Sequence, residues 1–299
     1  MEIKYVDREL SETCVEKVYG DKGIEFLYNS LPGNLISPVL AKKFVSKLYG
    51  GRQDSPSSKN KILPFIRKFN IEIEEYLPEE GRSKDDPYSS FNQFFIRRFK
   101  EGQRHFSVVD NDFSAPCEAR YFAYSSLGEG DEIPVKGKYW NSHALLGNKK
   151  WAEEFDGGPA LLARLCPVDY HRFHYPVDGK RVDSYPVHGK FHSVNPIALK
   201  ANAKILCENE RFVTIFETKD FGNIAYVEVG AMMVGKIVQT HKADNFKKGD
   251  EKGYFLFGGS TVIIFGEPGR WSPDQDILEN TNNGIETFIK LGATLGQKS

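Results

Sequence analysis

The first hundred residues show a helical spacing of apolar side chains. Between residues 35 and 49, apolar residues recur at every fourth position, with lysines among them. They are Ile36, Leu40, Phe44 and Leu48. This spacing places the four side chains on one face and predicts an amphipathic helix. Shorter apolar patterns over 62–69 and 91–95 predict two further helices.

After about residue 105 the pattern changes to short runs of β-branched and aromatic residues, punctuated by glycine. These runs cover 212–216, 225–241 and 253–269. Runs of this composition are typical of strands. From Trp271 onward the chain is polar, and one modest apolar pattern near Ile285 to Leu291 predicts a helix.

The order of these patterns predicts the fold class and the domain organisation. Helical patterns come first and strand patterns follow, which indicates an α+β protein. We therefore expect amphipathic helices in an N-terminal region over 1–105, followed by a β-rich catalytic body over 106–299. No internal repeat or low-complexity tract interrupts this plan.

Positive charge is concentrated in the predicted helices. Residues 41–70 hold eight Lys or Arg and one acid, Asp54. Two interpretations fit this segment. The helices pack on a core with solvated cations, or their apolar face enters lipid headgroups while Lys42, Lys43 and Lys47 meet anionic lipid.

Composition narrows the class of protein. With 40 Lys plus Arg against 41 Asp plus Glu, the net charge is −1, so the chain is no general nucleic-acid coat. No apolar run approaches the roughly 20 residues that span a bilayer, and the polar start lacks a secretory signal. The four cysteines form no CxxC pair, so neither a disulfide framework nor a four-cysteine zinc site is indicated. We expect a folded protein of the reducing cytoplasm.

Three segments resemble known functional motifs but lack a required residue or structural context. The GAMMVGKI segment at 230–237 has Ile237 where a phosphate-binding loop needs Ser or Thr. His188 and His192 have the spacing of zinc ligands on a helix, but they lie in a Pro- and Gly-broken stretch typical of strands. A nucleophile elbow around Ser260 would need glycine at position 262, where the chain has Val262. We expect no metal site.

Three other segments carry more weight together than alone. They are SAPCEARYFAY at 114–124, DYHRFHYP at 169–176 and FGGST at 257–261. Singly, paired histidines are more often core residues than catalysts, and two glycines before a serine usually mark a turn or bulge. Jointly, they resemble phosphatidylserine decarboxylase, a pyruvoyl-dependent family made as a proenzyme, in its prokaryotic type II form.

The resemblance extends over essentially the whole chain. It includes 91–99, 165–176, 193–200, 226–237 and 248–263. A Gly-Ser-Thr motif with a YHRxH segment upstream is a highly specific combination. The chain therefore resembles an enzyme that makes phosphatidylethanolamine and CO₂ from phosphatidylserine.

The resemblance implies where the cofactor comes from. Removing CO₂ from an amino acid leaves electrons on the α-carbon, and ordinary side chains offer no sink for them. In this family, Ser260 would attack the carbonyl of Gly259, and the chain would divide into a 1–259 beta chain and a 260–299 alpha chain. Ser260 would become a pyruvoyl group that forms a Schiff base with the substrate.

The resemblance also assigns the supporting residues. His174 would take the proton of Ser260, and Glu118 would orient His174. His171 would serve the decarboxylation step as a general acid. The family's carboxylate is usually Asp, whereas this chain has Glu118 after Pro116 and Cys117. Glu is one methylene longer, which makes self-cleavage the point to test.

The resemblance implies partners and location as well. We expect phosphatidylserine as substrate, peripheral attachment to the cytoplasmic side of the cell membrane, no nucleic acid, and a homodimer of alpha/beta heterodimers. Two alternatives stay open. One is an inactive lipid-binding homologue that does not self-cleave, and the other is a serine hydrolase using Ser260 and His174, which Val262 disfavours.

Overall fold

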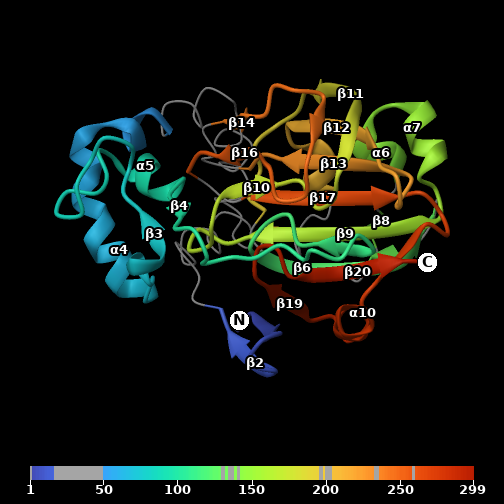
Figure 1. Cartoon of the computed structure of the whole chain (residues 1–299), viewed down its shortest axis with the longest axis horizontal. Coiled ribbons are helices and arrows are strands. Elements are labelled where there is room, and N and C mark those ends of the chain that lie inside the picture. Colours follow the sequence, from blue (N-terminus) through green and yellow to red (C-terminus); the bar gives the residue numbers. More distant parts are fainter. Residues whose placement is uncertain are drawn as a thin grey trace, which may run out of the picture.

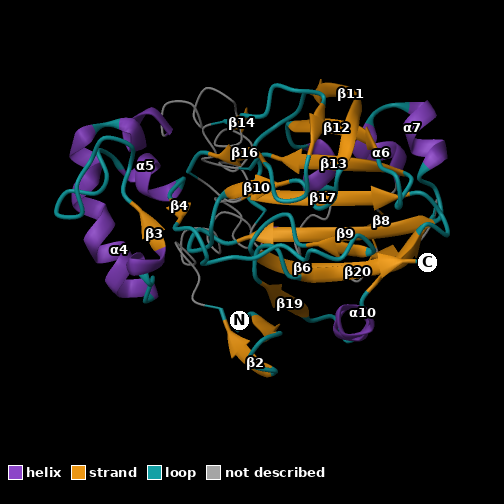
Figure 2. Ribbon diagram, viewed as in Figure 1, coloured by secondary structure: helices purple, strands orange, loops and turns teal. Residues whose placement is uncertain are grey.

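A ten-stranded sheet forms the centre of the molecule (Figures 1 and 2). The structure is a computed structural model and describes residues 2–16, 50–128, 132–133, 138–139, 142–194, 198, 204–231, 236–257 and 260–299. Neighbouring strands are antiparallel except for β1 and β19, which are parallel. In spatial order they are β15 (Asn245–Phe246), β11 (Gly179–Val187), β12 (Arg211–Glu217), β13 (Asn223–Val229), β17 (Ser260–Gly266), β9 (Gly158–Leu165), β6 (Ala119–Leu127), β19 (Glu286–Ile289), β1 (Lys4–Asp7) and β2 (Glu12–Val15).

Smaller sheets cover one face of the central sheet. Their aromatic residues, including Phe173, Phe255 and Trp271, share a buried core with Val262 and Ile264 of β17. These sheets are β10 (Arg172–His174) with β16 (Glu251–Phe255) and β14 (Ile237–Gln239), and β18 (Trp271–Pro273) with β20 (Thr294–Lys298) and β5 (Asp112–Ser114). Two two-stranded pairs complete the set, β3 (Tyr76–Leu77) with β4 (Arg98–Phe99) and β7 (Glu132–Ile133) with β8 (Lys138–Tyr139).

Short helices cover the other face. Leu146, Phe155 and Ile205, from these helices or next to them, pack with Ile263 and Phe265 of β17. The helices are α6 (Ser142–Leu146), α7 (Lys149–Glu154) and α9 (Ile205–Glu208). Successive side chains of a strand point to opposite faces, and both faces of β17 are buried. This explains why β17 is a continuous apolar run rather than an alternating one.

The N-terminal helices build a separate aromatic core at one end of the molecule (Figure 1). The helical segments are η1 (Pro56–Lys61), α4 (Ile62–Phe69), η2 (Ile73–Glu75) and α5 (Phe91–Phe95). At the start of α5, the hydroxyl of Ser90 accepts a hydrogen bond from the Gln93 N–H at 3.3 Å. The predicted helices over 62–69 and 91–95 are confirmed. The predicted helix between 35 and 49 lies outside the described residues.

The strand predictions and the α+β fold class are confirmed, but the predicted C-terminal helix is wrong. The run 212–216 lies within β12, and the two longer runs contain β13, β14, β16 and β17. Residues near Ile285 to Leu291 form β19, whereas the helix, α10 (Gln275–Asn282), lies earlier. The cause is tertiary, because β19 pairs with β1 on one side and β6 on the other. Gly284, at φ 70°, ends the helical turn before this strand begins.

Residues 2–16 belong to the body rather than to the helices. Strands β1 and β2 form a hairpin on the edge of the central sheet, next to β19. The sequence places these residues in the helical N-terminal region because four-residue strands carry little pattern of their own. Buried ion pairs of Glu16 with Arg120 and Arg164 fasten this hairpin to the body.

Candidate active site

Ser260 is the first residue of β17, in the interior of the central sheet. Its main chain pairs with Leu165 of β9, its side chain is completely buried, and its Oγ has no hydrogen-bond partner in the described part of the chain. Gly258 and Gly259 lie outside the described residues. Just before them, the Phe257 N–H donates to Asn92 Oδ1 at 2.9 Å, and the Phe257 ring packs against Phe91 and Phe95 of α5. Helix α5 therefore holds the chain immediately before the candidate cleavage site.

His171 is completely buried against helix α5. Its ring lies 3.8 Å from the ring of Phe95, centroid to centroid, and its carbonyl oxygen accepts a hydrogen bond from the Phe255 N–H. Burial is the main cause that lowers the pKa of His171 to about 3, and the positive charge of Arg97 adds to it. The imidazole is therefore neutral near pH 7.

The hydrogen bond of His171 fixes its tautomer. Nδ1 lies 3.0 Å from the carbonyl oxygen of Asp169, which can only accept, so Nδ1 carries the proton. Nε2 is then a lone-pair acceptor. It is buried and has no partner among the described residues. The predicted general acid is thus a base in this state, and it has to gain a proton before it can give one.

His174 lies at the end of β10 with both ring nitrogens occupied. Nδ1 lies 2.9 Å from the carbonyl oxygen of Gly249, so it donates, and Nε2 lies 3.2 Å from the hydroxyl of Tyr170. Burial lowers the pKa of His174 below its ordinary value. The neutral ring therefore accepts a hydrogen bond from Tyr170 at Nε2.

Glu118 lies just before β6 and is bound by an arginine. Arg104 Nε donates to Glu118 Oε2 at 2.6 Å, and Arg104 Nη2 donates to Oε1 at 3.3 Å. Arg104 also pairs with Glu75 at 3.0 Å. The segment just before Glu118 contacts the histidine directly, because the main-chain N–H of His174 donates to the carbonyl of Pro116 at 2.8 Å.

The structure therefore brings some of the predicted site residues together. The segment that carries Glu118 lies beside His174, and His171 lies against the helix that holds the chain before Ser260. Direct side-chain bonds from Glu118 to His174, or from His174 to Ser260, are absent among the described residues of this uncleaved state. Two of the four side chains, Ser260 and His171, keep an unpartnered buried polar atom.

Sequence reasoning missed the residues that support this arrangement. Tyr170 stands beside His171 in the quoted motif, and Asn92 stands in the quoted FNQFF segment, so a search for polar residues next to those motifs finds both. Arg104 gave no signal. It lies fourteen residues before Glu118 in a polar stretch, and only the folded chain shows their contact.

The rejected histidine pair carries no metal site. His188 is largely exposed and lies 3.4 Å from a carboxylate oxygen of Glu210, and His192 lies 3.7 Å from one of Glu208. Across the described ranges, no group of three His, Cys, Asp or Glu side chains is placed to hold a metal ion.

Fold and site together define an α+β protein with a buried serine at the start of an inner strand and two histidines on or next to β10, His171 fully buried and His174 partly buried, which is the layout of an enzyme. The family model of phosphatidylserine decarboxylase matches residues 91–297. Similar curated proteins, all named phosphatidylserine decarboxylase proenzyme, come from Fusobacterium nucleatum (40% identical), Clostridium novyi (41%) and Clostridium tetani (39%). Each match covers 99% of this chain and 98 to 99% of the relative. The chain belongs to the phosphatidylserine decarboxylase family.

Proposed function

We propose that this protein converts phosphatidylserine to phosphatidylethanolamine and CO₂, as a carboxy-lyase that makes its own pyruvoyl group from Ser260. One structural observation carries the proposal. The serine that follows two glycines heads an inner strand, and its buried Oγ has no partner among the described residues. A buried hydroxyl without a hydrogen bond costs free energy, and at this position the proposed self-cleavage gives it a use.

Self-cleavage begins at this hydroxyl. Ser260 Oγ loses its proton and attacks the carbonyl carbon of Gly259, and the amide between them becomes an ester. Loss of the Ser260 α-proton then expels the Gly259 carboxylate and leaves dehydroalanine at position 260. Water hydrolyses this residue through its imine form, ammonia leaves, and a pyruvoyl group caps the chain of residues 260–299.

His174 is the proposed base for the serine proton. It accepts at Nε2, the nitrogen that now takes the hydrogen bond of Tyr170, so cleavage requires that this bond open. Nδ1 keeps its proton through the carbonyl of Gly249, which holds the ring in the correct tautomer. The charge of Glu118 stabilises the imidazolium that forms on His174. Arg104 holds the Glu118 carboxylate in place, although its side chain is one methylene longer than the usual Asp.

In the processed enzyme, the pyruvoyl carbonyl would accept the electrons that the departing CO₂ leaves on the substrate α-carbon. The buried Oγ of Ser260, which has no partner among the described residues, supports the assignment of the reactive group to this position. His171 has a neutral Nε2, so it takes up a proton before it returns one to the substrate α-carbon. The amine of the substrate arrives as an ammonium and is a source of that proton.

Intact mass spectrometry of untagged protein tests the proposal. We expect one fragment near 29 kDa and one near 4.5 kDa, the latter with a blocked, carbonyl-bearing N-terminus, in place of the 33.9 kDa chain. Ser260→Ala should leave the chain whole. A wild-type chain that stays whole would instead support an inactive lipid-binding homologue.

Glu118 variants test the relay. Glu118→Gln removes the charge but keeps the length, so we expect a loss of cleavage of at least about 100-fold in rate. Glu118→Asp is the matched control, because it keeps the charge and restores the usual family residue. Normal processing of Glu118→Gln would remove Glu118 from the relay.

We further propose that the enzyme attaches peripherally to the cytoplasmic side of the cell membrane. A substrate with two acyl chains stays in the bilayer, so the enzyme has to meet it at the surface. The described end of the basic segment supports this, because Leu63 of α4 is 54% exposed and Arg67 lies one turn further along. Among the helices that the structure describes, none is long and apolar enough to span a membrane.

Flotation with anionic vesicles tests this attachment. The triple variant Lys42→Glu, Lys43→Glu, Lys47→Glu should release most of the protein from the vesicles. A triple variant on exposed lysines of the body, Lys180, Lys219 and Lys242, each changed to Glu, carries the same charge change and should stay bound. Equal binding of both variants would indicate that residues 35–70 have a structural role and do not attach the protein to the membrane.

The proposed assembly is a homodimer of alpha/beta heterodimers. It rests on the family resemblance alone. Light scattering on the eluted peak of a sizing column should give about twice 33.9 kDa. A mass of a single copy would overturn this part of the proposal.

A further inference from the structure

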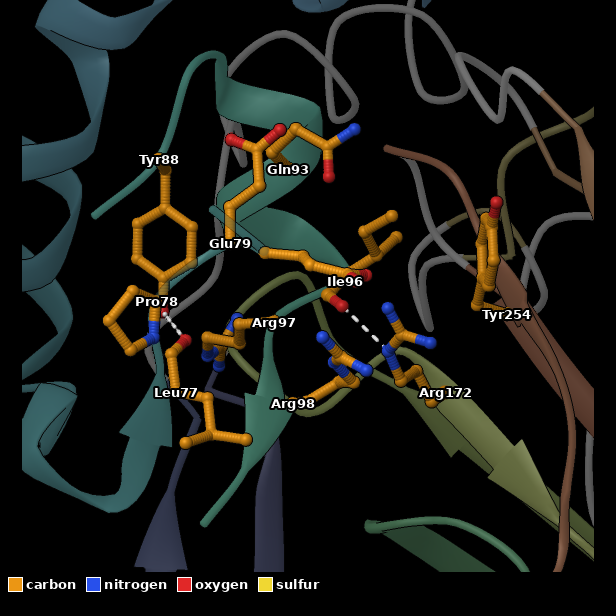
Figure 3. A pocket seen from close by; sticks show the side chains of 11 residues that line it. Leu77, Pro78, Glu79, Tyr88, Gln93, Ile96, Arg97, Arg98, Arg172 and Tyr254 are labelled. Atoms are coloured by element: carbon orange, nitrogen blue, oxygen red, sulfur yellow. Dashed lines mark hydrogen bonds between the residues drawn. The ribbon is translucent and has the colours of Figure 1, made fainter. Parts of the chain in front are cut away.

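A polar pocket of about 320 Å³ opens between the N-terminal helices and the small sheet β10–β16–β14 (Figure 3). Its walls come from three separate parts of the chain, which are the stretch 77–98, Arg172 and Tyr254. Gln93 lies on α5, Arg98 on β4, Arg172 on β10 and Tyr254 on β16, and the turn 77–80 closes one side. The self-cleavage chemistry proposed above uses none of these residues.

Arg172 is held at one side and free at the other. Its Nε donates to the carbonyl of Ile96 at 2.7 Å, and its Nη1 donates to both oxygens of Glu251, at 2.9 and 2.7 Å. A guanidinium has five N–H donors. These contacts use three of them, so both N–H groups of Nη2 remain without a bond to any described residue.

Arg98 is still less occupied. Its side chain is exposed and makes no hydrogen bond or ion pair with a described residue. Arg98 and Arg172 line the same pocket, and in the view of Figure 3 their guanidinium ends lie below Ile96, with Gln93 above them. Two like charges repel each other. An anion bound between the two guanidinium groups would attract both of them and outweigh that repulsion.

The acidic residues of the pocket, Glu79 and Glu80, do not supply this anion. Both carboxylate oxygens of Glu79 are bound to Ser89, at 2.7 Å to its N–H and 2.9 Å to its hydroxyl. Glu80 is exposed and forms no ion pair with either arginine. The unused donors of the pocket include Arg98, Nη2 of Arg172 and the amide of Gln93, which suits a ligand with several acceptor oxygens.

The pocket adjoins the candidate active site. Two of its lining residues, Ile96 and Arg172, directly follow Phe95 and His171, whose ring centroids lie 3.8 Å apart. In a serine phospholipid, the phosphorus is three bonds from the α-carbon that loses CO₂. A headgroup at the active site therefore carries its phosphate only a few ångströms from the reacting carbon.

We propose that this pocket binds the phosphodiester of a phospholipid headgroup, with Arg98 and Arg172 as its cationic ligands and Gln93 as a neutral donor. The proposal deepens the proposed function and rests on it. Arg98 acts on binding and takes no part in self-cleavage. Arginine forms paired hydrogen bonds with phosphate oxygens, which lysine cannot match.

Kinetics of the processed enzyme on a soluble, short-chain phosphatidylserine test the substrate as the source of the phosphate. Arg98→Gln should raise KM about five- to tenfold, with kcat and the extent of self-cleavage unchanged, since one charged hydrogen-bond donor is lost. Arg98→Lys should recover part of the affinity. Lys219→Gln, which removes one exposed cation from the body, should leave KM unchanged.

Direct binding separates this proposal from the proposed function. Uncleaved Ser260→Ala protein, with and without Arg98→Gln, is titrated with short-chain phosphatidylglycerol and with inorganic phosphate. Arg98-dependent binding of the lipid supports the pocket even if the wild-type enzyme decarboxylates nothing. Equal binding of inorganic phosphate would overturn the lipid assignment in favour of a free phosphate. If Arg98→Gln changes neither KM nor binding, the pocket is no anion site.

Discussion

The arginine cluster under the N-terminal hairpin and the candidate active site are both buried, but their polar groups differ in how they are satisfied. In the arginine cluster each charge faces an opposite one. Arg164 contacts Glu16 at 2.6 Å and Glu286 at 2.5 Å, and Arg120 contacts Asp169 at 2.7 Å. In the active site, Ser260 Oγ and His171 Nε2 have no partner among the described residues.

This difference separates structure from chemistry. A buried charge that loses its partner costs several kcal/mol, so paired clusters are kept for the integrity of the fold. A buried hydroxyl or imidazole nitrogen without a partner does not stabilise the fold, and at Ser260 and His171 the proposed chemistry gives a reason to keep it. Asp169 connects the two regions, because its carboxylate pairs with Arg120 while its carbonyl accepts the Nδ1–H of His171.

The largest expected effect is on the paired cluster. Arg164→Leu leaves Glu16 and Glu286 partly uncompensated, so we expect a loss of about 5 kcal/mol in the free energy of unfolding, the upper end of such changes. Urea unfolding in the uncleaved Ser260→Ala background measures it. Arg270→Leu is the control, since its ion pair with Glu267 is exposed and should be worth less than about 1 kcal/mol. Equal losses in the free energy of unfolding for the two variants would show that the buried cluster is no more important for stability than an exposed ion pair.

A third buried site sharpens the comparison, because it is paired only in part. Lys252 Nζ bonds to Glu228 and, at 2.9 Å, to Gln239, yet Glu228 Oε2 has no partner among the described residues. Burial lowers the pKa of Lys252 and raises that of Glu228, against the attraction between their charges.

Lys252→Met alone should cost about 3–4 kcal/mol, because it leaves a buried carboxylate unpaired. The double variant Lys252→Met, Glu228→Leu should recover most of that stability, since well-packed apolar residues replace a buried pair without penalty. Urea unfolding in the Ser260→Ala background measures both. In the wild-type background, normal cleavage of the double variant would group the pair with the structural cluster, and lost cleavage would group it with the active site.

A smaller effect is expected with acid. Burial opposes the charge of Glu16, but Arg164 and Arg120 outweigh it and lower the pKa of Glu16 from 4.5 to about 2. The folded state then binds fewer protons than the unfolded chain between these values. Stability from Glu16 is therefore fully present above pH 4.5 and is lost as the pH falls toward 2, by about 3 kcal/mol in all. Glu16→Gln should flatten this part of the pH profile of urea unfolding, and an unchanged profile would contradict the pairing.

Local pattern sufficed for much of the fold. Helices α4 and α5 and the runs of β12, β13 and β17 follow from side-chain spacing and from β-branched composition. The quoted motifs also indicated Ser260, His171 and His174. The pattern failed near Ile285 to Leu291, where a short apolar stretch is helical in spacing but lies between two strands that supply hydrogen bonds. Pairing of this kind depends on residues more than a hundred positions away.

The sequence by itself determined the α+β class, the Gly-Ser junction at 259–260 and the histidine motif, because each is a local arrangement of residue types. Only the tertiary structure decided the partners of those side chains: Arg104 on Glu118, Tyr170 on His174, and a carbonyl that leaves Nε2 of His171 unprotonated. It also joined Arg98 and Arg172 in one pocket. Long-range contacts of this kind depend on how strands and helices pack, and burial, which shifts the pKa values of the histidines, exists only in the folded chain.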